Sequence, residues 1–258
     1  MVFDSHFFKI EYVESNIDTS VLWENHCHAR FEMIGVLEGD VSVMIEGIKY
    51  RLTENQAIII PPLCYHTLTA NKQERYRRIT VLFDSNAIPK ALISHFVSHA
   101  PIAVFSASHL EGLKGLCQES APSLYAPLAD ALMVQSFYEF LDARIGNDFP
   151  HTDDFLQRSV DYIDNHLQEK ICIDDLARLT SRSRSSFCHL FEERMKISPK
   201  QYILQKKLAL ANKMMGEGLS PTETAIQLGY ENYSSFYRMY VKQYGVMPRK
   251  TRSSHGKP

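Results

Sequence analysis

Four side chains near the start of the chain have the types and spacing of metal ligands. His26 and His28 are separated by one residue, Glu32 follows after three more, and four residues separate His66 from Pro61. Imidazole nitrogens and carboxylate oxygens are ligands that Zn, Fe, Mn and Ni accept in proteins. A set of this composition could hold a divalent transition metal and support isomerase or dioxygenase chemistry.

This spacing is similar to the two-motif pattern of the cupin family, which implies a β-barrel. The glycines usual in that pattern are missing, since Ser20, Asn55 and Leu63 occupy their places and Ala70 replaces the terminal Asn. The sequence therefore favours a hydrogen-bonded polar cluster with no metal cofactor, and a metal-dependent cupin enzyme is the alternative. An effector pocket fits either interpretation, because barrel mouths are common small-molecule sites.

Charge is divided unevenly along the chain. The whole chain has a net charge of −2, but residues 171–258 contain 15 Lys/Arg against 7 Asp/Glu, a net charge of +8. The other 170 residues carry a net charge of −10. A basic segment attached to an acidic body suits binding of a polyanion. We find no convincing nucleophile and base set for catalysis, so we expect a binding protein and not an enzyme.

The basic segment contains one helix-turn-helix pattern written twice. Phe187 recurs as Phe236 at an offset of 49 residues, whereas Ala177 recurs as Ala225 at an offset of 48. The turn of the second copy is therefore predicted to contain one extra residue, near Gly229. Two copies of a unit that presents a short helix on a basic surface predict a reader of two successive DNA grooves.

The boundaries of the helices in this segment are well marked. Ser198-Pro199 and Ser220-Pro221 each offer an N-cap followed by a proline at the first helical position. They predict a long helix over residues 199–215 that joins the two units. Ser183 and Asn232 are the expected N-caps of the two recognition helices.

At residues 229–236 and 245–248 the chain resembles the AraC/XylS family of bacterial transcription regulators, and the match covers about residues 153–252. The first copy departs from the family pattern in two ways. Lys196 lies where the family commonly has Gly, and Glu192-Glu193 lie where basic residues are usual. We expect the first copy to bind DNA less tightly for that reason.

The resemblance implies that one face of each recognition helix contacts DNA. Phe187, Phe191, Phe236 and Tyr240 are expected on the opposite face, in the core. Arg238 can donate two hydrogen bonds to a guanine edge, and Lys242 can contact a phosphate. The implied DNA contacts are Arg182, Arg184, Ser185, Cys188 and His189 in the first copy, and Tyr233, Ser234, Tyr237, Arg238 and Lys242 in the second.

In the amino-terminal part, up to about Phe83, apolar and polar residues alternate as they do in short strands. This pattern predicts an all-β barrel or sandwich. Residues 124–141 predict an amphipathic helix with a wide apolar stripe of Leu124, Leu128, Leu132, Phe137, Phe140 and Leu141. We expect this stripe to form a dimer interface; the alternative is that it is satisfied within the chain. Residues 146–151 are the expected linker.

The expected fold is α+β. It has a cupin-like β-barrel domain with accessory helices over residues 1–148, and an all-α domain with two helix-turn-helix motifs over residues 152–258. The expected partners are double-stranded DNA, a small-molecule effector, a second copy of the chain and, for an activator, RNA polymerase. A constitutive regulator whose barrel only dimerises is a further alternative. Five scattered cysteines and the lack of a leader or membrane span favour the cytoplasm.

Overall fold

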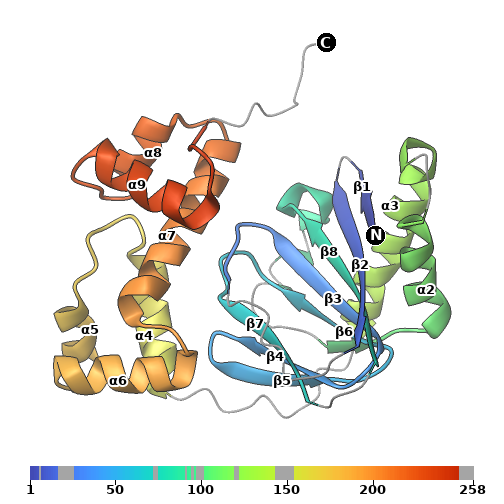
Figure 1. The fold of residues 1–258 in the computed structure, drawn as a ribbon, viewed down its shortest axis with the longest axis horizontal. Coiled ribbons are helices and arrows are strands. Elements are labelled where there is room, and N and C mark those ends of the chain that lie inside the picture. Colours follow the sequence, from blue (N-terminus) through green and yellow to red (C-terminus); the bar gives the residue numbers. More distant parts are fainter. Residues whose placement is uncertain are drawn as a thin grey trace. The chain divides into compact units, whose positions relative to one another are not determined.

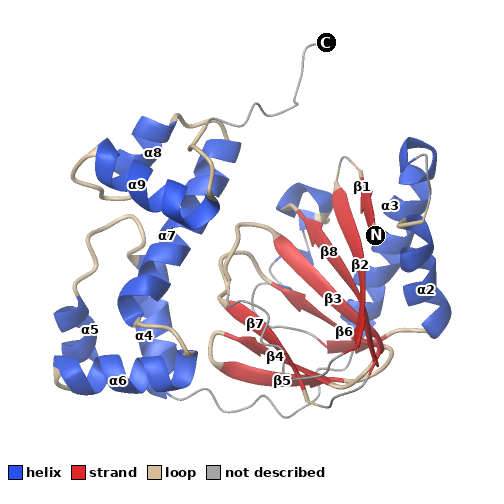
Figure 2. Cartoon of the chain, viewed as in Figure 1, coloured by secondary structure: helices blue, strands red, loops and turns tan. Residues whose placement is uncertain are grey.

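A computed structural model of the protein describes residues 1–5, 7–16, 26–71, 75–90, 92–93, 96, 102–118, 122–142 and 154–249. The chain divides into two compact units. One contains Met1–Asn25 and Arg30–Pro150, and the other contains His151–Pro258 together with the short segment His26–Ala29. Strands lie in the amino-terminal unit and the carboxy-terminal unit is helical (Figure 2). The α+β prediction is confirmed, whereas the expected linker lies outside the described residues.

The amino-terminal unit contains two antiparallel sheets (Figure 1). The larger has the strand order β1-β2-β8-β3-β6-β9, and the smaller has the order β5-β4-β7. The strands are β1 (Val2–Asp4), β2 (Phe8–Asn16), β3 (Phe31–Glu38), β4 (Val41–Ile45), β5 (Ile48–Leu52), β6 (Gln56–Ile60), β7 (His66–Ala70), β8 (Arg75–Phe83) and β9 (Ile102–Val104). A short 3-10 helix (Ser85–Ala87) follows β8, and the helices are α2 (Ala107–Leu116) and α3 (Pro122–Asp142).

Strand β3 is buried on both faces and separates two apolar cores. Met33 belongs to the core that contains residues of α2 and α3, whereas Ile34 and Val36 pack with residues of the smaller sheet. Successive side chains of a strand point to opposite faces. Glu32 therefore shares the second face with Ile34 and Val36, and this alternation positions a carboxylate at the start of the inter-sheet core.

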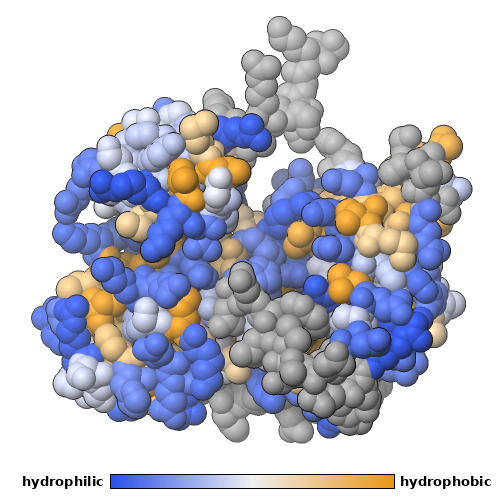
Figure 3. Space-filling view, viewed as in Figure 1, coloured by the Kyte–Doolittle hydropathy of each residue, from blue (hydrophilic) through white to orange (hydrophobic). Residues whose placement is uncertain are grey.

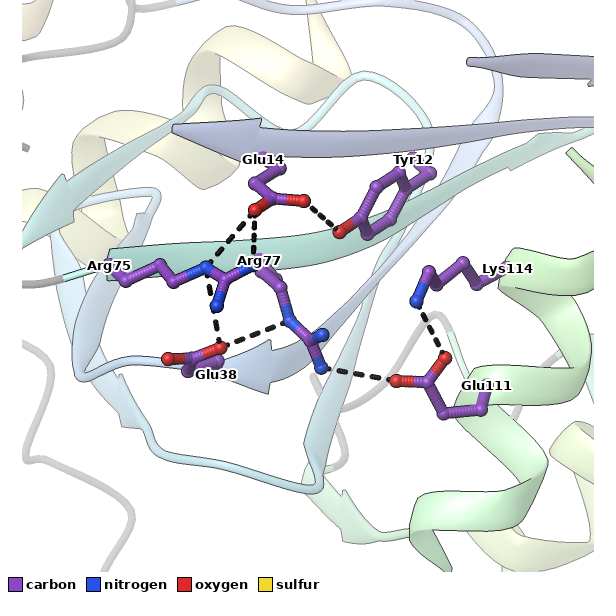
Figure 4. A network of polar contacts seen from close by, with 7 residues as sticks. All are labelled: Tyr12, Glu14, Glu38, Arg75, Arg77, Glu111 and Lys114. Carbon is purple, nitrogen blue, oxygen red and sulfur yellow. Dashed lines mark hydrogen bonds and ion pairs between the residues drawn. The ribbon is translucent and has the colours of Figure 1, made fainter. Parts of the chain in front are cut away.

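A network of charges ties α2 to the larger sheet (Figure 4). Arg77 on β8 donates from Nη2 to Glu111 Oε1 on α2 at 3.1 Å, and its Nε lies 3.1 Å from Glu38 Oε2. Lys114 donates to the other oxygen of Glu111 at 2.9 Å. Helix α2 is thus held by ion pairs as well as by its buried leucines. The remaining members of the network are Tyr12, Glu14 and Arg75.

Helix α3 has one buried face and one exposed apolar face. The single stripe predicted from the sequence is wrong, because Phe137 and Phe140 are buried and Leu132 packs against the core. Leu124 and Tyr138 are 78% and 65% exposed. The exposed large apolar residues of α3 are Leu124, Leu128, Val134, Tyr138 and Leu141.

The carboxy-terminal unit contains two groups of helices joined by one long helix, α7, as Figure 1 shows. The first group is α4 (Asp154–Asn165), α5 (Ile173–Leu179) and α6 (Arg184–Met195). Helix α7 (Pro199–Gly216) has 18 residues, which gives a length of about 27 Å. The second group is α8 (Pro221–Gln227) and α9 (Tyr233–Tyr244). The predicted joining helix is confirmed.

The N-caps predicted from the sequence are confirmed as well. The side chains of Ser183, Ser198 and Asn232 each accept a hydrogen bond from the backbone N–H three residues later. Ser220 forms a full capping box with Glu223. These caps satisfy N–H groups that the first turn of a helix leaves without partners. No helix in the described part of the chain has the length and hydropathy that crossing a membrane requires.

Candidate functional sites

The two helix-turn-helix motifs have the same turn, with one residue added in the second. The N–H of Arg182 donates to the carbonyl of Ala177, and the N–H of Tyr230 donates to the carbonyl of Ala225, at the same offset of 48. The helices that follow, α6 and α9, begin 49 residues apart. The extra residue is therefore Glu231, and the prediction of a longer second turn is confirmed.

Both recognition helices bury an aromatic face. Phe187 and Phe191 of α6 are buried, and so are Phe236 and Tyr240 of α9, as the sequence predicts. The ring of Phe191 packs edge-on against the ring of Tyr202 on α7, with centroids 5.3 Å apart. The opposite face of each helix is left for other contacts.

The outward face of α9 carries the residues predicted to read DNA. Tyr233, Ser234, Arg238 and Lys242 are exposed, and Tyr237 is half-buried with its ring centroid 6.1 Å from that of Tyr233. Arg238 and Lys242 lie four residues apart, so they lie on neighbouring turns of one face. Neither makes an ion pair with any residue that the structure describes. Two uncompensated cations on one helix face form a candidate interface for a polyanion.

The outward face of α6 differs in charge from that of α9. Ser185 and His189 are exposed and Cys188 is half-buried, but Arg184 Nη1 lies 2.9 Å from Asp174 Oδ2 on α5. The guanidinium of Arg182 lies over the Phe155 ring, 5.1 Å from its centre. The acidic pair of α6 (Glu192 and Glu193) is exposed on the same helix. Positive charge on α6 is thus partly neutralised within the unit.

The two recognition helices end in the same backbone conformation on different residues. Lys196 has φ 57° and Gly245 has φ 69°, and each follows the last residue of its helix. The left-handed region is strained for a residue with a Cβ atom and free for glycine. The recognition helix of the first copy thus ends in the same left-handed conformation as that of the second. Lys196 is strained there, at a position where the family commonly has glycine.

A buried lysine that the sequence analysis missed links the two helical groups. Lys207 of α7 is 9% exposed, and its Nζ donates to the carbonyls of Glu169, before α5, and Leu228, after α8. Burial lowers the pKa of its ammonium group. A signal was present in the sequence, because Lys207 lies four residues from both Ile203 and Ala211 and so falls on the buried stripe of α7.

The same link includes a close backbone contact. A Cβ atom placed on Gly229 would lie 3.2 Å from the carbonyl oxygen of Gln168, and Gly229 has φ 72°. Lys170 Nζ lies 3.1 Å from Glu231 Oε1 on the exposed side. The turn of the second motif is therefore packed directly against the loop that precedes α5.

The structure brings together the four residues spaced as metal ligands. One ligand atom from each of His26, His28, Glu32 and His66 lies within 4.8 Å of all the others. Glu32 and His66 are buried, His28 is half-buried and His26 is exposed. His66 Nε2 lies 2.8 Å from Glu32 Oε2, and its Nδ1 lies 2.9 Å from the carbonyl oxygen of Cys64. Burial lowers the pKa of His66, but the hydrogen bond and charge of Glu32 outweigh it and raise the pKa.

Two residues that occupy positions of the usual cupin glycines have the left-handed backbone conformation that glycine favours. Asn55 has φ 63° and Leu63 has φ 64°, in the left-handed region that glycine prefers. Their replacement therefore did not remove the turns, which weakens the sequence-based objection to a metal site. Ser20 lies outside the described residues.

A shallow depression of about 500 Å³ lies over the smaller sheet. Four of its five lining side chains, those of Asp40, Ser42, Arg51 and Asn71, are hydrogen-bonded to one another. Arg51 donates to both oxygens of Asp40, and Asn71 Nδ2 donates to Asp40 Oδ1 at 2.8 Å. The depression is lined by Asp40, Ser42, Lys49, Arg51 and Asn71. Because these groups bind one another, this surface is not a strong candidate for a ligand site.

Comparison with known protein families divides the chain in the same way. Residues 7–141, more than half of the chain, match a family described as an AraC-like ligand binding domain. Residues 176–254 match a helix-turn-helix domain. The second match begins within α5 and includes the rest of the first motif, helix α7 and the second motif.

Individual relatives agree with these family matches. The chain is 26% identical over 237 residues to the uncharacterized HTH-type transcriptional regulator YobQ of Bacillus subtilis, with 90% of each chain covered. It is 37% identical over 90 residues to the probable transcriptional regulator LumQ of Photobacterium leiognathi, where it spans 36% of that protein's length. Among solved structures, ToxT from Vibrio cholerae is 12% identical with a TM-score of 0.45, over 94% of this chain and 96% of that one. At that similarity ToxT gives no information about function.

Proposed function

Because this chain belongs to the AraC/XylS family of helix-turn-helix transcriptional regulators, we propose that it binds a specific operator with α6 and α9 and responds to a small-molecule effector. As a transcriptional regulator it is not an enzyme, and the metal-dependent cupin enzyme is set aside. The observation that supports operator binding best is the face of α9, where Arg238 and Lys242 are exposed and unpaired among the described residues.

Helix α9 supplies most of the base contacts in this proposal. Tyr233 and Ser234 lie in its first turn, the part of a recognition helix that meets base edges in the major groove. Arg238 follows one turn later and can donate two hydrogen bonds to guanine O6 and N7. Lys242, one turn further on, contacts a phosphate and fixes position without reading sequence.

Helix α6 contributes fewer base contacts than α9 in this proposal. Its Ser185 and His189 offer single hydrogen bonds to base edges. Arg184 must leave Asp174 before it can contact DNA, which lowers the net gain from that contact. Glu192 and Glu193 repel phosphates that lie near their end of the helix.

The partner of the exposed face of α3 is a second copy of this chain. The exposed apolar residues run from Leu124 to Leu141, which gives a stripe of about 26 Å. In the part of α3 whose side chains are described, no exposed residue is charged. A long apolar face without charge marks an interaction surface, and two copies related by a two-fold axis would cover the same face on each other. In the view of Figure 3 further apolar surface gathers at the β1 edge of the larger sheet.

The remaining parts of the proposal follow from the family. The effector is held by the amino-terminal domain, which matches the AraC-like ligand binding domain. The protein acts in the cytoplasm, where its DNA is, and an activator of this kind would also contact RNA polymerase. If the barrel only dimerises, small molecules will leave the operator affinity and the melting temperature unchanged.

DNA binding is tested by selecting binding sites from random duplexes with the full chain and measuring affinities by fluorescence anisotropy. Arg238→Ala should cost about 1–3 kcal/mol at one base pair and relax preference there. Lys213→Ala is the control, because Lys213 is exposed on α7 outside both recognition helices. If Arg238→Ala lost equal affinity for selected and random DNA, base reading would be contradicted. If the selection enriched no sequence, operator binding would be contradicted.

Dimer formation is tested by sedimentation of Leu128→Asp, with Ser108→Asp on α2 as the control. Both residues are exposed, so neither substitution should disturb the core. We expect the wild type and Ser108→Asp to sediment as dimers and Leu128→Asp as a folded monomer. A wild-type chain that stays monomeric at micromolar concentration would contradict the proposed partner of α3.

A further inference from the structure

We infer that Lys207 determines the operator spacing that the protein accepts, because it clamps the two helical groups together and so holds α6 and α9 at one separation. The inference rests on the proposed function, since it requires both recognition helices to contact the same DNA. Lys207 is buried in the middle of α7. It is therefore a positioning residue, which acts on DNA binding without touching DNA.

Helix α7 joins the two groups but does not by itself fix their orientation. The first group is attached through Tyr202, whose ring packs against that of Phe191 on α6. The second group is attached further along the helix, where Met215 belongs to the same core as Phe236 of α9. Long helices curve, so bending between these two attachments would change the angle between the recognition helices. A contact between the groups beside the helix axis resists that bending.

Lys207 provides such a contact through its ammonium group. Its Nζ donates to the carbonyl oxygen of Glu169 at 2.5 Å and to that of Leu228 at 2.8 Å. Glu169 lies in the loop between α4 and α5, in the first group, and Leu228 is the C-cap of α8, in the second. Carbonyls at the end of a helix lack partners within it and attract cations. One ammonium group thus binds one backbone acceptor from each group.

The contact is made at the turn that places α9. Gly229 follows Leu228, and a Cβ atom added there would lie 3.2 Å from the carbonyl oxygen of Gln168 and 3.3 Å from the carbonyl carbon of Glu169. The backbone of the turn therefore lies directly against the backbone of the loop. Asn232, only three residues after Gly229, is the N-cap of α9. A shift of the turn against the loop would thus move the start of the recognition helix.

The preceding lysine offers a matched comparison. Lys206 is also buried, but its Nζ lies 2.5 Å from Asp164 Oδ1 on α4 and donates to the hydroxyl of Tyr202 at 3.1 Å. These contacts join α7 to the first group. Replacing either lysine by Met keeps a long apolar stem and removes the donors. Both substitutions should therefore destabilise the helical unit, whereas only Lys207→Met removes the clamp between the groups.

The experiment measures spacing preference with the full chain and an operator selected by the wild type. The half whose base preference is lost in Arg238→Ala is the α9 half, and the other is the α6 half. One base pair is inserted between them, which adds about 3.4 Å of separation and about 35° of rotation. Affinities for both duplexes are measured on each preparation. Their ratio does not depend on the folded fraction, because unfolded protein lowers binding to both duplexes alike.

The insertion should weaken binding by the wild type roughly three- to tenfold, because the contacts of α6 are lost. Lys206→Met should keep this ratio. For Lys207→Met the ratio should fall below about twofold, since the two groups then adjust to the new spacing. Gly229→Ala, which leaves α7 unchanged, should lower the ratio as well, so a second chain tests the clamp if Lys207→Met does not fold.

Three results would overturn the inference and leave operator binding in place. They are a wild type that tolerates the insertion, a wild-type ratio retained in both Lys207→Met and Gly229→Ala, and an equal fall of the ratio in Lys206→Met. The last result would assign the effect to lost stability and not to the clamp. A wild type that selects no sequence at all would overturn the proposed function and this inference together.

Discussion

The two helix-turn-helix motifs share a scaffold and differ in the surface that they present. Each has a turn with matching backbone hydrogen bonds, a side-chain N-cap and a left-handed residue after the recognition helix. On α9 two exposed cations make no ion pair with a described residue, whereas on α6 Arg184 is paired and two acids are exposed. The scaffold therefore tolerates divergence of the outward face, and the difference predicts unequal roles in DNA binding.

A second difference lies in how each turn is supported. The turn of the second motif packs against the loop before α5 through Gly229, and Lys207 binds carbonyls on both sides of that contact. The position equivalent to Gly229 in the first motif is Ser181, with φ 54°. The second turn thus carries the contact between the two helical groups, and its glycine is needed for space as well as for conformation.

The largest effect on stability is expected from Lys207→Met. The substitution keeps an apolar stem in the buried stripe but removes the donor to the carbonyls of Glu169 and Leu228. Losing a buried donor in this way should lower the free energy of unfolding of the helical unit by about 2–3 kcal/mol. Lys213→Met, at an exposed position of α7, is the control. Urea unfolding followed by circular dichroism measures both, and equal stability of the two variants would contradict the link.

The next largest effect on stability is expected in the two turns, where Gly229→Ala and Ser181→Gly should act in opposite directions. Gly229→Ala combines left-handed strain, which costs about 1–2 kcal/mol, with a contact of 3.2 Å to the carbonyl oxygen of Gln168. Ser181→Gly, the reciprocal change, relieves left-handed strain of about 1–2 kcal/mol against an unfolded-state entropy cost of about 0.4–1 kcal/mol, so it should stabilise slightly. Thermal unfolding of both variants checks the signs. Two shifts of the same sign would show that the turns are not equivalent in conformation.

A moderate effect on binding is expected when the acids of α6 are neutralised. The double substitution Glu192→Gln with Glu193→Gln removes repulsion of phosphates and should tighten operator binding by roughly two- to fivefold at low salt. The gain should shrink as salt rises, because screening weakens both attraction and repulsion. Affinities at two salt concentrations check this. A gain that is absent at low salt would place these acids away from the DNA.

The smallest effect is expected from Lys196→Gly, at the end of the first recognition helix. Lys196→Gly should stabilise the protein slightly, since relief of about 1–2 kcal/mol of left-handed strain at this residue, φ 57°, exceeds the unfolded-state entropy cost of glycine, about 0.4–1 kcal/mol. Gly245→Ala at the equivalent position should destabilise it by about 1–2 kcal/mol. Melting temperatures measured side by side test the pair. A destabilised Lys196→Gly would mean that the lysine side chain itself makes a stabilising contact.

Features set by local sequence were predictable. The caps at Ser183 and Asn232 and the longer second turn depend on residues within a few positions of each other. The contacts of Lys207 were not predicted, because they join residues 38 and 21 positions away in the chain. No local pattern reports such distant partners.

The two faces of α3 show a limit of another kind. Helical periodicity predicts that an amphipathic face exists, but Leu132 and Leu128 are both leucines four residues apart. Only tertiary packing decides that Leu132, which lies beside Gly112 of α2, contacts the core and that Leu128 is exposed. In the metal-ligand cluster the spacing correctly grouped the four residues. The replacement of the usual glycines kept the turns, because Asn55 and Leu63 adopt the left-handed conformation in their place.

The central claim is that α9 reads most of the operator sequence and α6 reads less. The direct measurement uses a selected operator in which either half is replaced by random bases, with the α9 half defined as the one whose preference is lost in Arg238→Ala. Mismatched base pairs cost about 1–3 kcal/mol each in a specific complex. Replacing the α9 half should reduce binding to the non-specific level, and replacing the α6 half should cost less than roughly tenfold in affinity. Equal losses from the two halves, or a greater loss from the α6 half, would contradict the account.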